Sequence, residues 1–296
     1  MDKRHFLLLN VGHFLDHFFL LIFATAAVLS LTNEWQLSYA QLIPYSTAGF
    51  IAFGLFSLPS GWLADKWSRE GMMFVFFIGI GLSSIGTSTA QSPIEIALWL
   101  FLVGIFASIY HPVGLALIAK GGKKMGMEIA INGVWGNMGV GFAAFITGLM
   151  IDQTGWRSAF WLPGVLSILI GVVYFFNQKE NILVSFKPFK KESIKTEENS
   201  AKMHSNEVRD IIFKVSLVIF FTTAVSSVIF QGTTFALPKV FEERLSGIAS
   251  SASFLGFLAL FVFAVASFAQ LVVGKMLDKI GPKKVFLILF AFKNIL

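Results

Sequence analysis

The sequence contains no cysteine among its 296 residues. Disulfides, iron–sulfur clusters and thiol nucleophiles are therefore excluded, and cysteine usage gives no clue to the redox compartment. Charge is also scarce, because Asp, Glu, Lys and Arg make up 14% of the residues, whereas soluble domains carry about 25%. A soluble surface needs more charge than this, so the sequence does not describe an ordinary soluble domain.

Long apolar runs take the place of the missing charge. Hydrophobic residues make up 55% of the chain, and the mean hydropathy is +0.74. A hydrocarbon core of about 30 Å takes roughly 20 apolar residues per helix, and each helix must satisfy its own backbone hydrogen bonds there. Eight runs have that length, at residues 6–31, 40–60, 71–90, 94–118, 128–151, 157–176, 211–237 and 248–274. A ninth begins near Val285, so we expect an all-α polytopic membrane protein whose sequence ends inside a span.

The basic residues predict the orientation. With the N-terminus in the cytoplasm, nineteen Lys and Arg residues fall on the inside and only Arg157, Lys239 and Arg244 fall on the outside. This asymmetry follows the positive-inside rule and predicts a multi-pass protein of a bacterial inner membrane with a cytoplasmic N-terminus. The net charge of +6 is then a topology signal, so no nucleic-acid partner is expected.

A polar, mixed-charge stretch at residues 177–210 interrupts the apolar pattern. We interpret it as a cytoplasmic linker between a six-span bundle at 1–176 and a partial second bundle at 211–296. The alternative for residues 182–189 is an amphipathic segment that lies on the membrane surface.

Two loops of the chain repeat one pattern. "GWLADKWSREG" follows the second run, and "GKMLDKIGPKK" follows the eighth. Each loop has a glycine, an aspartate four residues later and then a lysine. The matching residues are Gly61, Asp65, Lys66 and Arg69 in the first copy and Gly274, Asp278 and Lys279 in the second. Two related halves with the same loop are typical of secondary transporters.

The loops resemble the cytoplasmic signature of the major facilitator superfamily, G-x-x-x-D-[RK]-x-G-x-[RK]-[RK]. "TGWRSAF" at 154–160 adds to this resemblance, while "SIYHPVGLALIAKGG" and "NGVWGNMGVG" are similar to the fosmidomycin-resistance-like branch. The resemblance implies twelve spans and a monomeric transporter, not an enzyme, that exports a small-molecule substrate in exchange for protons without a cofactor. Leu100 and the pair Ala143–Ala144 depart from common fourth- and fifth-span signatures, so proton-coupled uptake is the alternative.

Three ionisable residues interrupt the first run in "HFLDHFFL". His13, Asp16 and His17 stand at i, i+3 and i+4, so they project from one face of a helix. An intramembrane acid costs at least ~2.5–3.5 kcal/mol on insertion scales and usually faces a cavity or a partner. We expect this face to line the central pathway and to couple transport to protons. The alternative is a His–Asp pair that only fixes helix packing.

A metal site is a rival interpretation of the same stretch. His13 and His17 have the i, i+4 spacing of zinc ligands on a helix, with Asp16 as a possible third ligand. An intramembrane metalloenzyme generally needs more histidines, and His111 is the only other one within a span. We therefore expect no metal and no enzymatic activity. An inactive fragment is a further alternative.

Other polar residues of the spans are weaker candidates. His111 precedes Pro112, which is expected to kink the fourth span, and it could serve the pathway or bond a carbonyl that Pro112 frees. Asn132 and Asn137 in the fifth span and Gln231 in the seventh are further cavity candidates, although such residues often serve as interhelical contacts.

The repeated loops are expected to form a cytoplasmic gate. Asp65 and Asp278 can accept N–H bonds from a neighbouring helix start, and Asp65 can pair with Arg69 or Lys66. Gly61 and Gly274 would let helix backbones approach closely. The alternative is a tight charged turn that only obeys the positive-inside rule.

Overall fold

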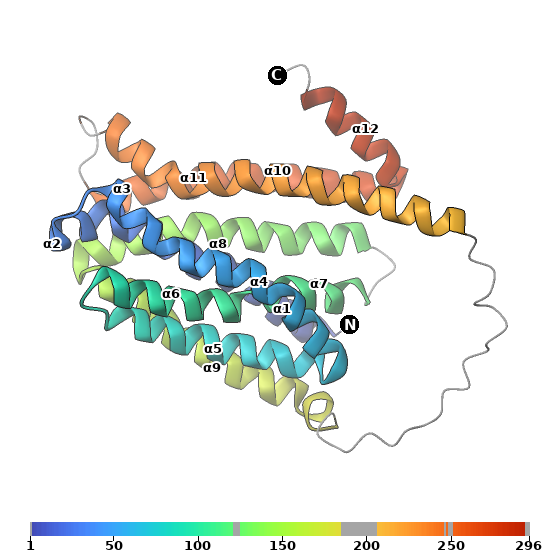
Figure 1. Cartoon of the computed structure of the whole chain (residues 1–296), viewed down its shortest axis with the longest axis horizontal. Helices are drawn as coiled ribbons and strands as arrows, with labels where there is room; N and C mark the ends of the chain where they lie inside the picture. The colour runs from blue at the N-terminus through green and yellow to red at the C-terminus, as the bar shows by residue number, and fades with distance from the viewer. Residues whose placement is uncertain (1, 121–124, 185–205, 246, 248–250, 294–296) are drawn as a thin grey trace. The chain divides into compact units, whose positions relative to one another are not determined.

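The computed structural model describes residues 2–120, 125–184, 206–245, 247 and 251–293, and every element within these ranges is helical (Figure 1). The elements are α1 (Lys3–Ala26), η1 (Ala27–Leu31), α2 (Thr32–Trp35), α3 (Tyr39–Leu42), η2 (Ile43–Ser46), α4 (Thr47–Lys66), α5 (Arg69–Ser88), α6 (Pro93–Ala107), α7 (Tyr110–Ala119), α8 (Met125–Gln153), α9 (Trp156–Val184), α10 (Asn206–Leu245), α11 (Ala252–Ile280) and α12 (Pro282–Lys293). Here η1 is a π-helical turn and η2 is a 3₁₀ turn.

Eight helical stretches of the described residues are long and apolar enough to cross a membrane, as predicted. Most of them extend a few residues beyond the apolar runs, and the first covers Lys3–Trp35. The ninth apolar run lies in α12, which begins at Pro282. Within the predicted linker, α9 continues to Val184 and α10 begins at Asn206, while residues 185–205 lie outside the described ranges.

The chain divides into two compact units, and each is described by itself. One unit comprises residues 1–186 and 238–296, and the other comprises residues 187–237. The first unit holds α1 to α9, the end of α10, α11 and α12. The predicted division into two bundles stays a prediction.

Glycines let the helices of the first unit pack backbone against backbone. A Cβ atom added to Gly104 of α6 would lie 2.0 Å from the carbonyl oxygen of Gly49, at the contact between α6 and α4. A Cβ on Gly81 of α5 would lie 2.6 Å from the carbonyl oxygen of Gly164 of α9. Lipid supplies no hydrophobic drive for helix association, so such close contacts carry much of the packing energy.

The fourth span is broken as Pro112 predicts. α6 ends at Ala107 and α7 begins at Tyr110. Pro112 has no N–H group, so the carbonyl of Ser108 lacks its usual partner four residues later. This break places His111 in the first turn of α7, so the predicted kink is confirmed.

α8 and α11 cap each other. Asp278, near the end of α11, accepts the backbone N–H groups of Gly126 (2.9 Å) and Met127 (3.0 Å) in the first turn of α8. Asp152, near the end of α8, accepts those of Ala252 (3.3 Å) and Ser253 (2.9 Å) at the start of α11. A carboxylate suits a helix N-terminus because it satisfies free N–H groups and complements the helix dipole. The two helices are therefore antiparallel and are fastened at both ends.

Candidate functional site

A buried carboxylate lies at the centre of the candidate site. Asp16 of α1 is 0% exposed, and its Oδ2 lies 3.3 Å from Nε2 of His111 on α7. By geometric criteria neither carboxylate oxygen has a hydrogen-bond partner among the described residues. The His111 side chain is 35% exposed. The first and fourth spans thus bring an acid and an imidazole together inside the protein.

His13 is fixed by a buried polar network that joins α1, α7 and α8. Its Nδ1 donates to the carbonyl oxygen of Asn132 (2.7 Å), and its ring stacks on Tyr110 with centroids 4.8 Å apart. The Asn132 amide donates to Asn10 Oδ1 and to the Tyr110 hydroxyl, each at 2.8 Å. The Tyr110 hydroxyl in turn donates to the carbonyl of Leu9 (2.9 Å). Such connected networks fix the positions of their members.

Three imidazoles gather beside Asp16. Ring centroids are 5.0 Å apart for His13 and His17, 5.2 Å for His13 and His111, and 5.5 Å for His17 and His111. We call these three histidines with Asp16 the His–Asp cluster. His17 and His111 are half-buried, so the cluster is open on that side. Imidazole nitrogens at this spacing can bind a polar solute or a transition metal.

A glycine of α8 makes room for the imidazoles. A Cβ atom on Gly136 would lie 2.8 Å from Nε2 of His13 and 3.0 Å from Cδ2 of His17. Any larger residue there would push both rings, so the cluster depends on a residue that holds no functional group itself.

The structure brings together four of the six predicted pathway residues. His13, Asp16 and His17 share one face of α1 and meet His111. Asn137 is half-buried in α8, and no contact described here joins it to the cluster. Gln231 belongs to the second unit, so it is described apart from the cluster.

Asn10 and Tyr110 were not predicted as site residues from the sequence. Two signals could have found them: Asn10 stands three residues before His13 on the same helix, and Tyr110 directly precedes His111.

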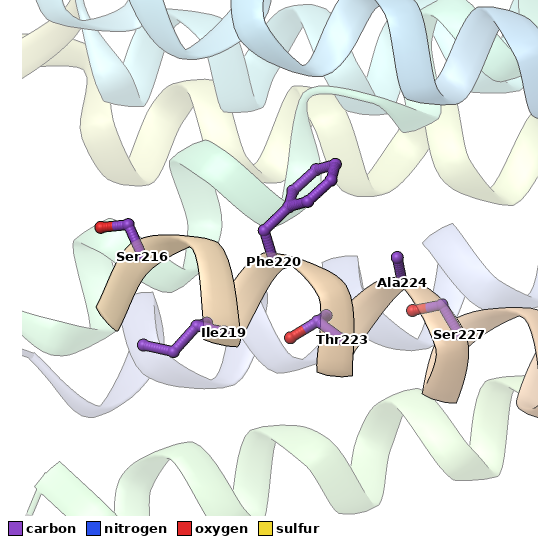
Figure 2. Close-up of a pocket in the computed structure, with 6 residues that line it drawn as sticks. All are labelled: Ser216, Ile219, Phe220, Thr223, Ala224 and Ser227. Carbon is purple, nitrogen blue, oxygen red and sulfur yellow. The ribbon is translucent and has the colours of Figure 1, made fainter. Parts of the chain in front are cut away.

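The second unit has a pocket of its own on α10, with a mostly apolar surface. Ser216, Ile219, Phe220, Thr223, Ala224 and Ser227 line it (Figure 2). Gln231 stands four residues after Ser227, one helical turn further, so it continues the hydroxyl-bearing face. Gln231 was predicted from the sequence, whereas Ser216, Thr223 and Ser227 on this face were not.

The first gate motif forms a local ion pair. Asp65 Oδ1, near the end of α4, lies 2.7 Å from Nη2 of Arg69, the first residue of α5. Lys66 is exposed. A Cβ on Gly61 would lie 3.3 Å from Cβ of Pro112 in α7, so this glycine does permit close approach.

The second gate motif behaves differently, because Asp278 caps α8. Gly274 lies against the same helix, where its Cβ would be 2.3 Å from Cβ of Ala130. Lys279 is exposed. The first copy thus pairs with a basic residue and the second caps a helix, and the gate role of both stays a prediction.

Membrane-length apolar helices that enclose an ionisable cluster define a polytopic membrane protein of the transporter class. The sequence profile of the Major Facilitator Superfamily matches residues 9–295. The chain belongs to this superfamily, whose members are transporters and not enzymes.

Relatives and solved structures agree with this assignment. The gallate transporter of Pseudomonas putida is 28% identical over 143 residues, which are 48% of this chain and 32% of that protein. The multidrug resistance protein MdtG of Escherichia coli is 25% identical over 242 residues, 80% of this chain and 56% of the relative. A bacterial homolog of the human lysosomal transporter Spinster, inward-facing and occupied, has a similar fold, with a TM-score of 0.64 and 18% identity over 96% of this chain and 63% of that chain. This chain thus matches between a third and about half of the length of these curated relatives.

Proposed function

We propose that this chain belongs to a secondary active transporter that exports a small solute by alternating access, in exchange for protons. The His–Asp cluster carries the proposal, because ionisable groups inside apolar spans are costly and usually serve a transport pathway. The name of MdtG, a multidrug resistance protein, supports export. The finer resemblance to the fosmidomycin-resistance-like branch is part of this proposal, as are the bacterial inner membrane, the cytoplasmic N-terminus and the monomeric state.

The His–Asp cluster is the proposed solute-binding part of the pathway, and Asn137 and Gln231 are proposed as further lining residues. The imidazoles of His17 and His111 are half-buried and can meet a solute, while His13 and Asp16 lie behind them. Two aromatic rings contact the cluster: the ring centroid of Phe53 lies 5.9 Å from that of His111, and the ring of Tyr110 stacks on His13. Imidazoles and aromatic faces together suit small organic solutes.

The gate residues have a matching role. Asp65 pairs with Arg69, and Asp278 caps α8. Both aspartates belong to the repeated loops, whose other members are Gly61, Lys66, Gly274 and Lys279. We propose that these contacts hold the cytoplasmic end closed in one of the two alternating states.

Reconstituted vesicles test direction and coupling together. With the protein in vesicles and a panel of labelled drugs and organic acids, an imposed pH gradient should drive solute against the direction of proton flow. Loss of the gradient through a protonophore should stop this movement. Solute that moves with the protons would instead establish the alternative, proton-coupled uptake, and flux that ignores the gradient would refute coupling.

The cluster itself is tested by Asp16→Asn, which removes the negative charge with little change of shape. Solute movement should be lost while the thermal unfolding of the purified protein stays near that of the unaltered chain. His5→Asn is a matched control, because His5 is a buried histidine of α1 that bonds Tyr174 (3.1 Å) outside the cluster. Full transport by Asp16→Asn would overturn the assignment of the pathway.

A further inference from the structure

The three imidazoles of the His–Asp cluster have the arrangement of a metal-ligand set. His13, His17 and His111 each offer one nitrogen, and these nitrogens lie within 4.8 Å of one another. Tetrahedral zinc with Zn–N bonds of about 2.1 Å places its ligand nitrogens about 3.4 Å apart. The nitrogens, now within 4.8 Å of one another, would have to approach by roughly 1.4 Å to reach this separation. Side-chain rotation of the half-buried His17 and His111 can supply a movement of this size.

His13 is prepared as a ligand. Its Nδ1 must carry the proton, because its partner is the carbonyl oxygen of Asn132. Nε2 of a neutral ring then has a free lone pair, and this atom has no hydrogen-bond partner among the described residues. The residue is only 6% exposed. Metal-binding histidines typically donate their other N–H to a carbonyl or a carboxylate, which fixes the ring and the tautomer.

Asp16 supplies the charge that a cation needs. The carboxyl group is completely buried, both of its oxygens lack hydrogen bonds in the described part of the chain, and it lies 3.3 Å from His111. A buried anion without hydrogen bonds is costly, whereas the same anion beside a bound cation is stabilised. Carboxylates that support metal sites accept the other N–H of a ligand histidine, and Oδ2 of Asp16, at 3.3 Å from Nε2 of His111, is near enough to do so once the ring turns.

We propose that His13, His17 and His111 bind a divalent transition-metal cation, with Asp16 as the supporting carboxylate, and that this cation is the solute or part of it. The second half of this proposal rests on the proposed transport function. Imidazole ligands suit Zn²⁺, Ni²⁺ and Cu²⁺. Three protein ligands leave a fourth position for water or for a small chelating acid, so the ion can be carried free or as a chelate.

The sequence alone did not favour a metal, because it offered only the pair His13 and His17 on one helix. The third imidazole comes from α7, ninety-four residues after His17 in the chain. The break before Pro112 places it there.

Cobalt binding to the purified protein tests the site without any transport. Co²⁺ absorbs visible light in a way that reports its ligands. His13→Asn is the sharpest variant, because the Asn amide can still donate to the Asn132 carbonyl while the Nε2 ligand is gone. We expect it to weaken binding more than about 100-fold, since loss of a supporting residue alone costs about 10–100-fold. His111→Asn should do the same, and Asp16→Asn should weaken binding about 10–100-fold.

Two further variants separate the site from general effects on folding. Gly136→Ala removes no ligand, yet its Cβ would lie 2.8 Å from His13 Nε2, so it should weaken binding by displacing the ring. His5→Asn changes a buried histidine outside the cluster and should leave binding unchanged. No cobalt spectrum, or a spectrum that His13→Asn and His111→Asn leave intact, would overturn the site.

Movement of radioactive zinc in vesicles tests the solute. Zinc that moves alone identifies the free ion, and zinc that moves only with citrate identifies a chelate. Zinc that binds but moves in neither case refutes the metal as solute, and the organic-solute panel then decides the transport proposal separately. If neither zinc nor any solute moves, the proposed function fails, while the binding data still judge the site.

Discussion

The two caps between α8 and α11 lie at opposite ends of this helix pair, so removal of one cap should loosen only its own end. Asp278→Asn keeps the size of the side chain, but it removes the charge and replaces one of the two oxygens that accept backbone N–H groups with an NH₂ donor. A charge at a helix N-terminus is worth about 0.3–1 kcal/mol, and a lost hydrogen bond costs about 0.5–1.5 kcal/mol. Both aspartates are exposed, so we take about 1 kcal/mol, which changes a two-state ratio about fivefold.

The absence of cysteine provides the assay, because any introduced thiol is the only one in the chain. Ala130→Cys places a thiol next to Gly274 near the Asp278 cap, and Ala252→Cys places one at the Asp152 cap. Both alanines are buried. With a membrane-impermeant maleimide, Asp278→Asn should speed labelling at position 130 about fivefold and leave position 252 unchanged. Asp152→Asn should do the reverse.

A control keeps the interpretation specific. Asp65→Asn removes only the ion pair with Arg69 and touches neither α8 nor α11, so labelling at position 130 should stay constant. Equal acceleration at both ends by either cap variant would mean that the helices loosen as a whole. That result would refute the idea that each cap closes its own end.

Three further predictions concern the stability of the protein in detergent and the contacts that maintain it. Gly104→Ala should destabilise the folded protein by about 1–3 kcal/mol, because the added Cβ overpacks against the carbonyl of Gly49. Gly54→Ala should not, because a Cβ there meets nothing within 4 Å. Equal thermal unfolding of the two variants would contradict the close contact at Gly104. Asn132→Ala should cost about 1–3 kcal/mol because buried polar partners lose their hydrogen bonds, and a urea midpoint equal to that of the unaltered protein would count against the network. Glu34→Gln should cost at most about 1 kcal/mol, because its pair with Arg157 (2.9 Å) is half-exposed, and the loss should shrink in high salt; a salt-independent effect would argue for packing instead.

The spans could be predicted because membrane thickness sets the length of an apolar run. Their ends could not, since helices continue past the apolar run into polar and aromatic residues, as the first does from Lys3 to Trp35. Hydropathy falls at such residues, but the backbone hydrogen bonds of the helix continue through them.

The shared face of His13, Asp16 and His17 also followed from the sequence, because helical spacing is a local property. Their meeting with His111 depends on how α7 packs, and no local pattern encodes that. Asp152 was missed for a related reason. Its partners are backbone N–H groups, which every residue except proline offers, so a cap across two helices has no signature in the partner sequence.

The same property gives the α8–α11 caps a one-sided evolutionary constraint. Met127 contributes only its main-chain N–H to the cap from Asp278, so substitutions at this position other than proline can accumulate without loss of the contact. The constraint falls instead on Asp152 and Asp278. An alignment of orthologues should therefore show an invariant acid at position 278 facing a variable position 127, a pattern that pairwise covariation would not detect.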